Sequence, residues 1–323
     1  MAVRNHGAEA SAVSVASARC VVFAYQEMGY ACTQALLEAG APIAALFTHE
    51  DAPGENIWWR PVRELARRHA IPVHLCPEID RAGTAQVARL RPALLYSFYW
   101  RSLLPAALLE LAALGAYNLH GSLLPAYRGR APVNWMLING ERRAGVTLHH
   151  MVARADAGDI VAQRAVDIEE SDTALSLHLK LARLGAELVR EMHPSIVAGR
   201  APRRPQDLSQ GSYFGRRRPE DGRIDWRWPA RRVFDFVRAL THPYPGAFCF
   251  AGGRKLFVWE AKVSAETLAP AAPGSIIGPG PDGAVEVAAG QGSVWLLRTQ
   301  FENGAQGPAA AALAADRALA RLN

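Results

Sequence analysis

Short apolar runs alternate with helical segments along the first part of the chain. We expect buried strands at residues 20–25, 43–48, 71–75, 93–98 and 116–119, and helices at residues 33–39, 62–69 and 105–113. Strands that are apolar on both faces and alternate with helices are typical of a parallel sheet covered on both sides. The pattern therefore predicts an α/β fold with a Rossmann-like, doubly wound parallel sheet.

The pattern changes after Gly199. A long helix is expected over residues 173–198 with Ser171 or Asp172 as its N-cap, and a Pro- and Arg-rich stretch follows it. Short apolar segments between turns then predict strands at residues 247–251, 255–261 and 294–299, and an Ala/Leu-rich helix at residues 308–323. We expect a disordered leader at 1–17, the Rossmann-like domain at 18–199, a linker at 200–212 and a smaller barrel-like, OB-type β domain at 213–323.

The first expected strand lacks the fingerprint of a dinucleotide-binding site. The residues after it, Tyr25-Gln-Glu-Met-Gly29, offer one glycine, whereas the dinucleotide motif uses a GxGxxG turn. The sequence therefore gives no reason to expect bound NAD, and an NAD-dependent oxidoreductase is a remote alternative.

Composition and charge say more about the location of the protein in the cell than about its chemistry. Of the 323 residues, 50% are hydrophobic, and the formal net charge is +6, which fits an anionic small molecule, a nucleic acid or simply a basic protein. Cys20, Cys32, Cys76 and Cys249 are scattered without a CxxC pair. We therefore expect neither a disulfide framework nor a zinc site, and a cytoplasmic location. No apolar run in the sequence is long enough to cross a bilayer.

The densest chemical information lies between residues 118 and 159. Asn118 and His120 stand two positions apart in an expected strand, so both side chains should lie on one face. An amide donor beside an imidazole can stabilise a developing oxyanion, and a histidine can transfer protons near neutral pH. Asp156 could hold the histidine in one tautomer or accept a proton from an attacking amine. Each residue alone has an ordinary structural explanation, but the combination predicts a catalytic site. Ser122 does not stand in a Gly-x-Ser-x-Gly motif, so serine hydrolysis is not expected.

The same residues carry a resemblance to a known family. Asn118-x-His120, Ser122-Leu-Leu-Pro125 and Asp156-x-Gly158 resemble motifs of the folate-dependent formyltransferases, which include methionyl-tRNA formyltransferase, glycinamide ribonucleotide transformylase and the sugar N-formyltransferases. The resemblance implies 10-formyltetrahydrofolate as formyl donor, no metal, and Asn118, His120 and Asp156 as catalytic residues. It places the folate pocket at Ser102, Leu103, Leu104, Val152, Ala153, Arg154, Ala155 and Asp156. Ordinary helix packing is the alternative for the two leucines.

A finer match concerns the acceptor of the formyl group. The stretch Tyr127-Arg-Gly-Arg-Ala-Pro-Val-Asn-Trp135 resembles the formyltransferase half of the bifunctional enzymes that act on UDP-4-amino-4-deoxy-L-arabinose, in lipid A modification and polymyxin resistance. Arg130 stands where tRNA formyltransferases usually have a small residue, and a guanidinium suits a phosphate or a carboxylate. The resemblance therefore implies a nucleotide-sugar acceptor bound by Arg130. Because the chain ends before a decarboxylating domain, a separate decarboxylating dehydrogenase is expected in the pathway.

Three alternatives stay open from the sequence. Methionyl-tRNA formylation is the same chemistry on a nucleic acid, whose phosphates could contact the basic runs at residues 200–204, 216–218 and 231–232. Another nucleotide-sugar N-formyltransferase would keep the same three catalytic residues. A folate- or nucleotide-binding protein without catalysis would not need all three. We expect a nucleotide sugar as the partner, and neither a nucleic acid nor a membrane.

Overall fold

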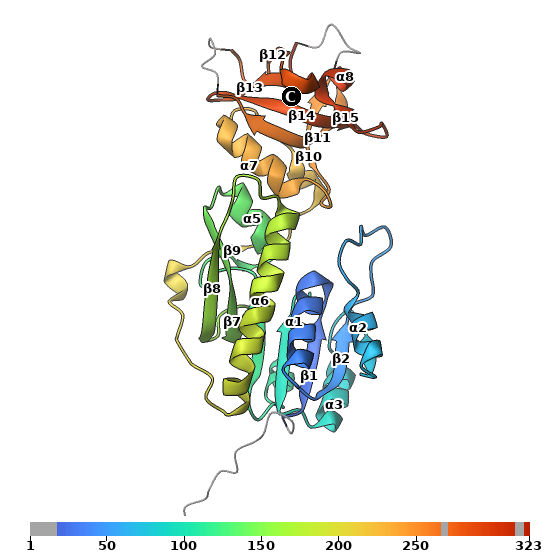
Figure 1. The fold of residues 1–323 in the computed structure, drawn as a ribbon, viewed down its shortest axis with the longest axis vertical. Coiled ribbons are helices and arrows are strands. Elements are labelled where there is room, and N and C mark those ends of the chain that lie inside the picture. Colours follow the sequence, from blue (N-terminus) through green and yellow to red (C-terminus); the bar gives the residue numbers. More distant parts are fainter. Residues whose placement is uncertain (1–17, 266–270, 314–319) are drawn as a thin grey trace, which may run out of the picture.

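A seven-stranded mixed sheet forms the centre of the larger of two stacked parts of the molecule (Figure 1). The computed structural model describes residues 18–265, 271–313 and 320–323, so the leader expected at residues 1–17 lies outside the described residues. The strand order is β3-β2-β1-β4-β5-β7-β8. The strands are β1 (Cys20–Ala24), β2 (Ile43–Thr48), β3 (Val73–Leu75), β4 (Leu94–Phe98), β5 (Ala116–His120), β7 (Arg143–His150) and β8 (Ile160–Asp167). Neighbours from β3 to β5 pair in parallel, whereas β7 pairs antiparallel with both β5 and β8.

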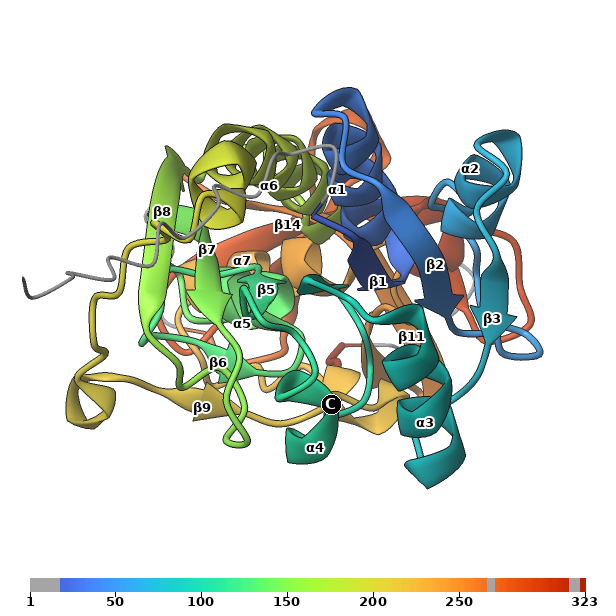
Figure 2. The same cartoon turned by 90° about the horizontal axis from the view of Figure 1, so that it is seen from below.

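Helices cover both faces of this sheet. They are α1 (Gln26–Glu38), α2 (Val62–Arg68), α3 (Arg81–Leu90), α4 (Ala106–Leu109) and α6 (Ala174–Val197), whereas α5 (Pro132–Ile138) packs against α6. Figure 2 shows α1, α2 and α6 on one face, and α3 and α4 on the other. All five residues of β1 are buried, as expected for a strand that is covered on both sides. The prediction of a Rossmann-like, doubly wound α/β domain is confirmed.

Gly29 lets α1 approach β1 closely. A Cβ atom at this position would lie 3.1 Å from the carbonyl carbon of Ala24. One glycine thus meets the packing requirement at this strand-to-helix turn, and the turn has no further glycines.

The smaller part is an antiparallel sheet against which α7 (Ala230–Leu240) packs. Its strand order is β10-β11-β14-β13-β12, and β15 pairs with β14. The elements are β10 (Ala247–Ala251), β11 (Arg254–Val263), β12 (Ile276–Pro279), β13 (Val285–Ala288), β14 (Ser293–Phe301), β15 (Gly307–Pro308) and α8 (Ala309–Leu313). The prediction of a smaller, β-rich C-terminal domain is confirmed. Figure 1 shows α5 and α7 at the junction of the two parts, where they contact each other.

Three helices differ from the sequence-based expectation. α1 begins at Gln26, before the start expected at residue 33, and α4 covers only four residues of the helix expected at 105–113. α6 begins after Thr173, whose hydroxyl accepts a hydrogen bond from the backbone N–H of Ser176, and not after Ser171 or Asp172. Composition thus locates a helix but does not fix its ends or choose among neighbouring polar caps.

The chain end was expected to be helical and is so only in part. α8 ends at Leu313, residues 314–319 lie outside the described residues, and Arg321 and Leu322 form β-bridges with Ser275 and Ala251. At Arg321 and Leu322, pairing with the sheet thus replaces the expected helix.

Residues 200–214 run along the larger part. A short strand in this segment, β9 (Tyr213–Phe214), pairs in parallel with β6 (Arg128–Gly129). Arg204 forms a β-bridge with Ile160. The stretch expected to be a linker is therefore hydrogen-bonded to the larger part, while the domain boundaries themselves stay a prediction. Among the described helices, none combines the length and the apolar character that a membrane crossing requires.

Buried histidines make the stability of the larger part sensitive to acid. His178 and His193 on α6 are almost completely buried, and burial lowers the pKa of each from 6.5 to about 4. The unfolded chain therefore binds a proton on each ring as the pH falls through 6.5, whereas the folded chain does so only near pH 4. We expect full stability above pH 6.5 and a progressive loss between pH 6.5 and 4, on the order of 3 kcal/mol per ring.

Urea unfolding at a series of pH values measures this dependence. His193→Phe should flatten it, because phenylalanine removes a ring that only the unfolded state protonates in this window. An unchanged slope in His193→Phe would show that this histidine does not contribute to the acid sensitivity.

Candidate active site

A cavity of about 620 Å³ opens at the carboxyl ends of the parallel strands β4 and β5. Small-molecule sites are typically of this size, roughly 300–1,000 Å³, and lie at this edge of open α/β sheets. Asn118, His120 and Asp156 all line it. The segment at residues 213–222 and the loop at residues 244–246 also line it, so both parts of the molecule form its wall.

Asn118 and His120 both face the cavity from β5, as the alternation of a strand predicts. Leu119 between them is buried in the core. β5 pairs with β7 so that Asn118 lies opposite His149, and His120 opposite Thr147.

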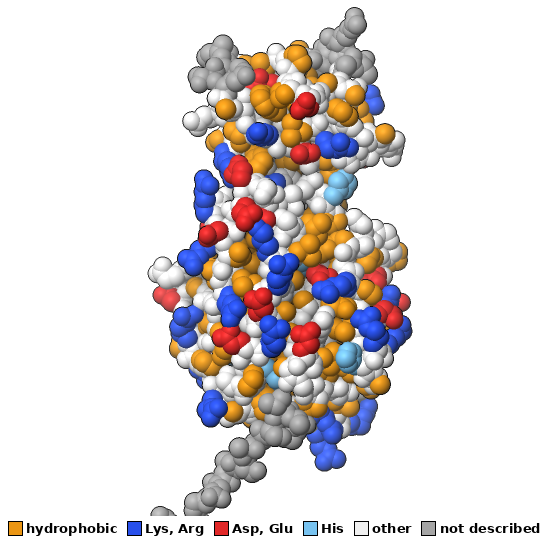
Figure 3. Space-filling view, in the orientation of Figure 1, with side chains coloured by type: hydrophobic (Ala, Val, Ile, Leu, Met, Phe, Trp, Pro, Cys, Tyr) orange, Lys and Arg blue, Asp and Glu red, His pale blue; other side chains and the backbone are white. Residues whose placement is uncertain are grey.

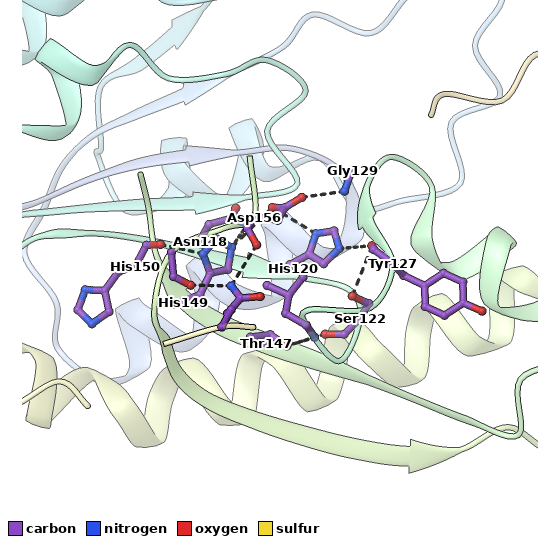
Figure 4. A network of polar contacts seen from close by, with 12 residues as sticks. Asn118, His120, Ser122, Tyr127, Gly129, Thr147, His149, His150 and Asp156 are labelled. Atoms are coloured by element: carbon purple, nitrogen blue, oxygen red, sulfur yellow. Dashed lines mark hydrogen bonds and ion pairs between the residues drawn. The ribbon is translucent and has the colours of Figure 1, made fainter. Parts of the chain in front are cut away.

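The ring of His120 is held in one tautomer when it is neutral. Its Nε2 lies 2.7 Å from the carbonyl oxygen of Tyr127. Because a carbonyl only accepts, Nε2 carries the hydrogen and the lone pair of the neutral ring is at Nδ1. Nδ1 lies 3.6 Å from Oδ1 of Asp156, an arrangement visible in Figure 4. The tautomer is therefore fixed by a backbone carbonyl, and Asp156 faces the nitrogen that can take up a proton.

His149 is a site residue to which the sequence reasoning assigned no role. Its Nδ1 donates to the carbonyl oxygen of His150 at 2.9 Å, so Nε2 of the neutral ring can accept the Nδ2–H of Asn118 at 3.0 Å. This contact orients the Asn118 amide (Figure 4). The signal that could have found His149 is the alternation in β7, a strand that was not predicted.

Asp156 sits in the loop between β7 and β8 in the left-handed region, with φ 51°. Its Oδ2 accepts the backbone N–H of Gly129 at 2.9 Å. Burial alone would raise the pKa of Asp156, but His120, His149 and the Gly129 N–H outweigh burial and hold the pKa well below the usual range. Asp156 is therefore a carboxylate at physiological pH, and it is a poor acceptor for a proton compared with Nδ1 of His120.

Gln206 holds the Asp156 loop from the segment that joins the two domains. Its Nε2 donates to the carbonyl oxygens of Asp156 at 3.0 Å and of Gly158 at 2.6 Å. Its Oε1 is buried and has no hydrogen-bond partner within the described residues. The conformation of the loop thus depends on a residue 50 positions away along the chain.

Gln206→Ala is expected to lower kcat by between about 10-fold and 100-fold, because small misplacements of a catalytic group cost up to this much. The dissociation constants of both substrates should change little, since Gln206 does not line the cavity. Steady-state kinetics with direct binding measurements would separate the two effects. Gln210→Ala, an exposed glutamine of the same segment, is the matched control and should retain wild-type kcat. Equal kcat values in the two variants would rule out the positioning role.

The residues implied for the folate pocket lie mostly along this cavity. Ser102, Leu103, Leu104, Val152 and Ala155 line it together with Asp156, whereas Ala153 and Arg154 are exposed and do not. Leu103 is 68% exposed, which does not fit the alternative of ordinary packing, whereas Leu104 is buried and also belongs to a core cluster. Trp100 also lines the cavity, and its buried Nε1 has no hydrogen-bond partner in the described part.

Arg130 and Ser122 also stand in the sequence motifs, and of the two only Arg130 lines the cavity. Arg130 is exposed and lines the cavity, and its guanidinium donates to the carbonyl oxygen of Arg101. Ser122 is buried and donates to the carbonyl oxygen of Ala126 at 2.6 Å, so its hydroxyl is not available as a nucleophile. The described residues hold no group of His, Cys, Asp and Glu side chains that could bind a metal ion.

Comparisons with known proteins agree with this geometry. Residues 24–192 match the family model of the formyl transferases, and residues 217–317 match that of the formyl transferase C-terminal domain. Among solved structures, the chain is similar to an N-formyltransferase from Helicobacter canadensis (TM-score 0.69, 16% identity, 88% of this chain and 99% of the other). It is also similar to a sugar N-formyltransferase from Shewanella (0.59, 19%, 78% and 98%).

HypX from Aquifex aeolicus is a further match (TM-score 0.63, 20% identity, 91% of this chain). The chain spans about half the length of HypX, 46%. These structures share the fold, and the two family models together cover most of the sequence. The chain belongs to the formyltransferase family, the folate-dependent enzymes that its Asn-His-Asp motif resembles.

Proposed function

We propose that the protein transfers the formyl group of 10-formyltetrahydrofolate to the 4-amino group of UDP-4-amino-4-deoxy-L-arabinose, for lipid A modification and polymyxin resistance. The observation that carries the proposal is one cavity that joins a base, Nδ1 of His120, to cationic side chains at Arg130, Arg216 and Arg218. The Helicobacter canadensis protein was solved with folinic acid and dTDP-3-aminofucose, and HypX with tetrahydrofolic acid. A separate decarboxylating dehydrogenase would supply the amino sugar's precursor.

The donor side of the cavity fits a reduced folate. Leu103, Leu104, Met151 and Val152 give it apolar walls, and the unpartnered Nε1–H of Trp100 offers a buried donor. Such a mixture of apolar surface with a few polar groups is typical of sites for ring systems. When bound, the formylated folate supplies an electrophilic formyl carbon.

His120, Asn118 and Asp156 would each have a different role in the transfer: proton acceptor, hydrogen-bond donor and fixed negative charge. Nδ1 of neutral His120 accepts the proton that the amine loses as its nitrogen bonds to the formyl carbon, and the resulting imidazolium is stabilised by Asp156, 3.6 Å away. The imidazolium returns this proton to N10 of the folate as the bond between N10 and the formyl carbon breaks, so that tetrahydrofolate leaves. The Asn118 amide, oriented by His149, donates to the formyl oxygen as that oxygen gains negative charge. Asp156 itself keeps its charge throughout, because its pKa is held below the usual range.

The acceptor side of the cavity fits the diphosphate of a nucleotide sugar. Arg130, Arg216 and Arg218 line it, and within the described ranges none of them forms a salt bridge. Guanidinium groups without a carboxylate partner at a cavity wall favour a phosphate-bearing ligand. The face in Figure 3 shows Lys and Arg interspersed with Asp and Glu, a distribution that does not favour a polyanion such as tRNA on that face.

Product analysis tests the function. Purified protein would be incubated with 10-formyltetrahydrofolate and either UDP-4-amino-4-deoxy-L-arabinose, a dTDP-linked 3-amino sugar or charged initiator tRNA, with products followed by mass. Formylation of the UDP sugar at the highest kcat/KM supports the proposal. Preference for the dTDP sugar would move the assignment to another nucleotide-sugar N-formyltransferase, and formylation of tRNA alone would overturn the nucleotide-sugar acceptor.

Arg130→Gln is expected to raise the KM for the nucleotide sugar by about tenfold to a hundredfold, since a charge-assisted hydrogen bond to phosphate contributes roughly 1.5–3 kcal/mol. The kcat and the KM for the folate should change little, because the lost contact is to the acceptor. Arg183→Gln, an exposed arginine on α6 away from the cavity, is the matched control. A KM equal to that of the control would remove Arg130 from the acceptor site.

A further inference from the structure

One wall of the cavity holds a buried histidine that the proposed mechanism does not use. His178 projects from α6 and is 2% exposed. It lines the cavity, and its buried Nε2 has no hydrogen-bond partner in the part of the chain that is described. Leaving a buried polar atom without a hydrogen-bond partner is costly. A histidine in this condition at a cavity wall therefore points to a ligand that supplies the missing hydrogen bond.

Aromatic rings fix the orientation of His178. The rings of Trp58 and Tyr99 each pack edge-to-face against it, with centroids 5.0 Å away in both cases. Burial keeps the pKa of His178 at about 4, with Glu27 only partly opposing the shift. The ring is therefore neutral at physiological pH and presents one hydrogen-bond donor and one acceptor.

Tyr99 connects His178 to the reacting centre. It lines the same cavity in a strained left-handed conformation, with φ 59°, a feature that is concentrated at functional sites. A Cβ atom at Gly121 would lie 3.3 Å from the Tyr99 hydroxyl, and Gly121 directly follows His120. The wall that contains Tyr99 and His178 is therefore next to the base.

The chemistry of this wall is neutral and polar. Gln26, also with a left-handed backbone at φ 59°, adds an uncharged amide to the phenol and the imidazole. Uncharged donors and acceptors beside aromatic surface suit a hydroxylated ring, whereas the cationic residues of the same cavity suit a diphosphate. A methionyl side chain would leave these polar atoms unpaired.

We propose that His178, together with Tyr99 and Gln26, forms a subsite that hydrogen-bonds a hydroxyl group of the acceptor's sugar ring. The inference rests on the proposed function, since it takes the acceptor to be a nucleotide sugar. His178 is then a specificity-determining residue, because a ring that lacks the hydroxyl leaves Nε2 unpaired.

His178→Phe tests the subsite, because phenylalanine keeps an aromatic ring between Trp58 and Tyr99 and removes both nitrogens. His193→Phe is the matched control: His193 is a buried histidine on the same helix, also with an unpartnered Nε2, but it does not line the cavity. Calorimetry would give the affinity of each variant for UDP-4-amino-4-deoxy-L-arabinose and for UDP alone. His178→Phe should bind the nucleotide sugar about tenfold more weakly and UDP unchanged, and His193→Phe should match the wild type for both.

The outcomes separate this inference from the proposed function. If wild-type protein neither binds nor formylates a nucleotide sugar, both proposals fall. If it does, and His178→Phe loses equal affinity for UDP and for the nucleotide sugar, or loses none, only the subsite is overturned.

Should His178→Phe not fold, acceptor analogues that each lack one ring hydroxyl provide the test on wild type and on His178→Gln. One analogue should bind the wild type about tenfold more weakly than the parent sugar, and this difference should shrink in His178→Gln. Equal binding of every analogue to the wild type would overturn the subsite.

Discussion

His120→Ala is expected to lower kcat by about 10³-fold while folate binding and folding stay close to wild type. The neutral ring keeps its lone pair at Nδ1, because Nε2–H donates to the Tyr127 carbonyl oxygen at 2.7 Å. Removal of the ring therefore takes away the proposed base for the amine proton, and a positioned general base is worth roughly 10²–10⁴ in rate. Single-turnover kinetics with bound folate measure this step directly.

Three comparisons make the His120 result specific. His74→Ala, on β3 and outside the cavity, should retain wild-type kcat. Folate affinity measured by calorimetry, and the urea midpoint, should stay near wild type in both variants. A His120→Ala enzyme with more than about a tenth of wild-type kcat would contradict the proposed base, since general-base catalysis is worth more than this.

Local patterns in the sequence predict the strands and helices that position the site. The apolar runs of β1 and β4 are fully buried and that of β2 is buried from Ala45 onward, and all three match the predicted strands closely. The Asn-x-His motif is equally local, because the alternation of one strand sends both side chains to one face. The Asp-x-Gly motif also has a local cause: a Cβ atom at Gly158 would overlap the carbonyl oxygen of His150.

Contacts between distant segments could not be predicted in this way. His149 reaches Asn118 only because β7 pairs antiparallel with β5, and the alternation along β7 does not show which strand it pairs with. Gln206 lies in a Pro- and Arg-rich stretch that composition marks as a linker, yet its amide holds the loop of Asp156. His178 lies on the helix expected at residues 173–198, and nothing in the sequence of that helix shows that this residue lines a cavity. Each of these residues depends on tertiary placement that no single stretch of sequence encodes.

Asp156→Asn is expected to lower kcat by about 10²–10³-fold. Asparagine keeps the shape of the side chain and an oxygen for the Gly129 N–H, which now lies 2.9 Å from Oδ2. What the substitution removes is the negative charge 3.6 Å from Nδ1 of His120. Opposite charges at this separation near a protein surface attract by about 4 kcal/mol, so the imidazolium that forms during transfer loses most of its stabilisation.

The charge, and not the shape, of Asp156 is what this substitution tests. Asp159→Asn is the matched control from the same loop, since Asp159 pairs with the exposed Arg203 at 3.4 Å and does not line the cavity. It should retain wild-type kcat and the same folate affinity. An Asp156→Asn enzyme that keeps more than about a tenth of the wild-type kcat would contradict the role of this charge, since the attraction it removes corresponds to a much larger factor in rate.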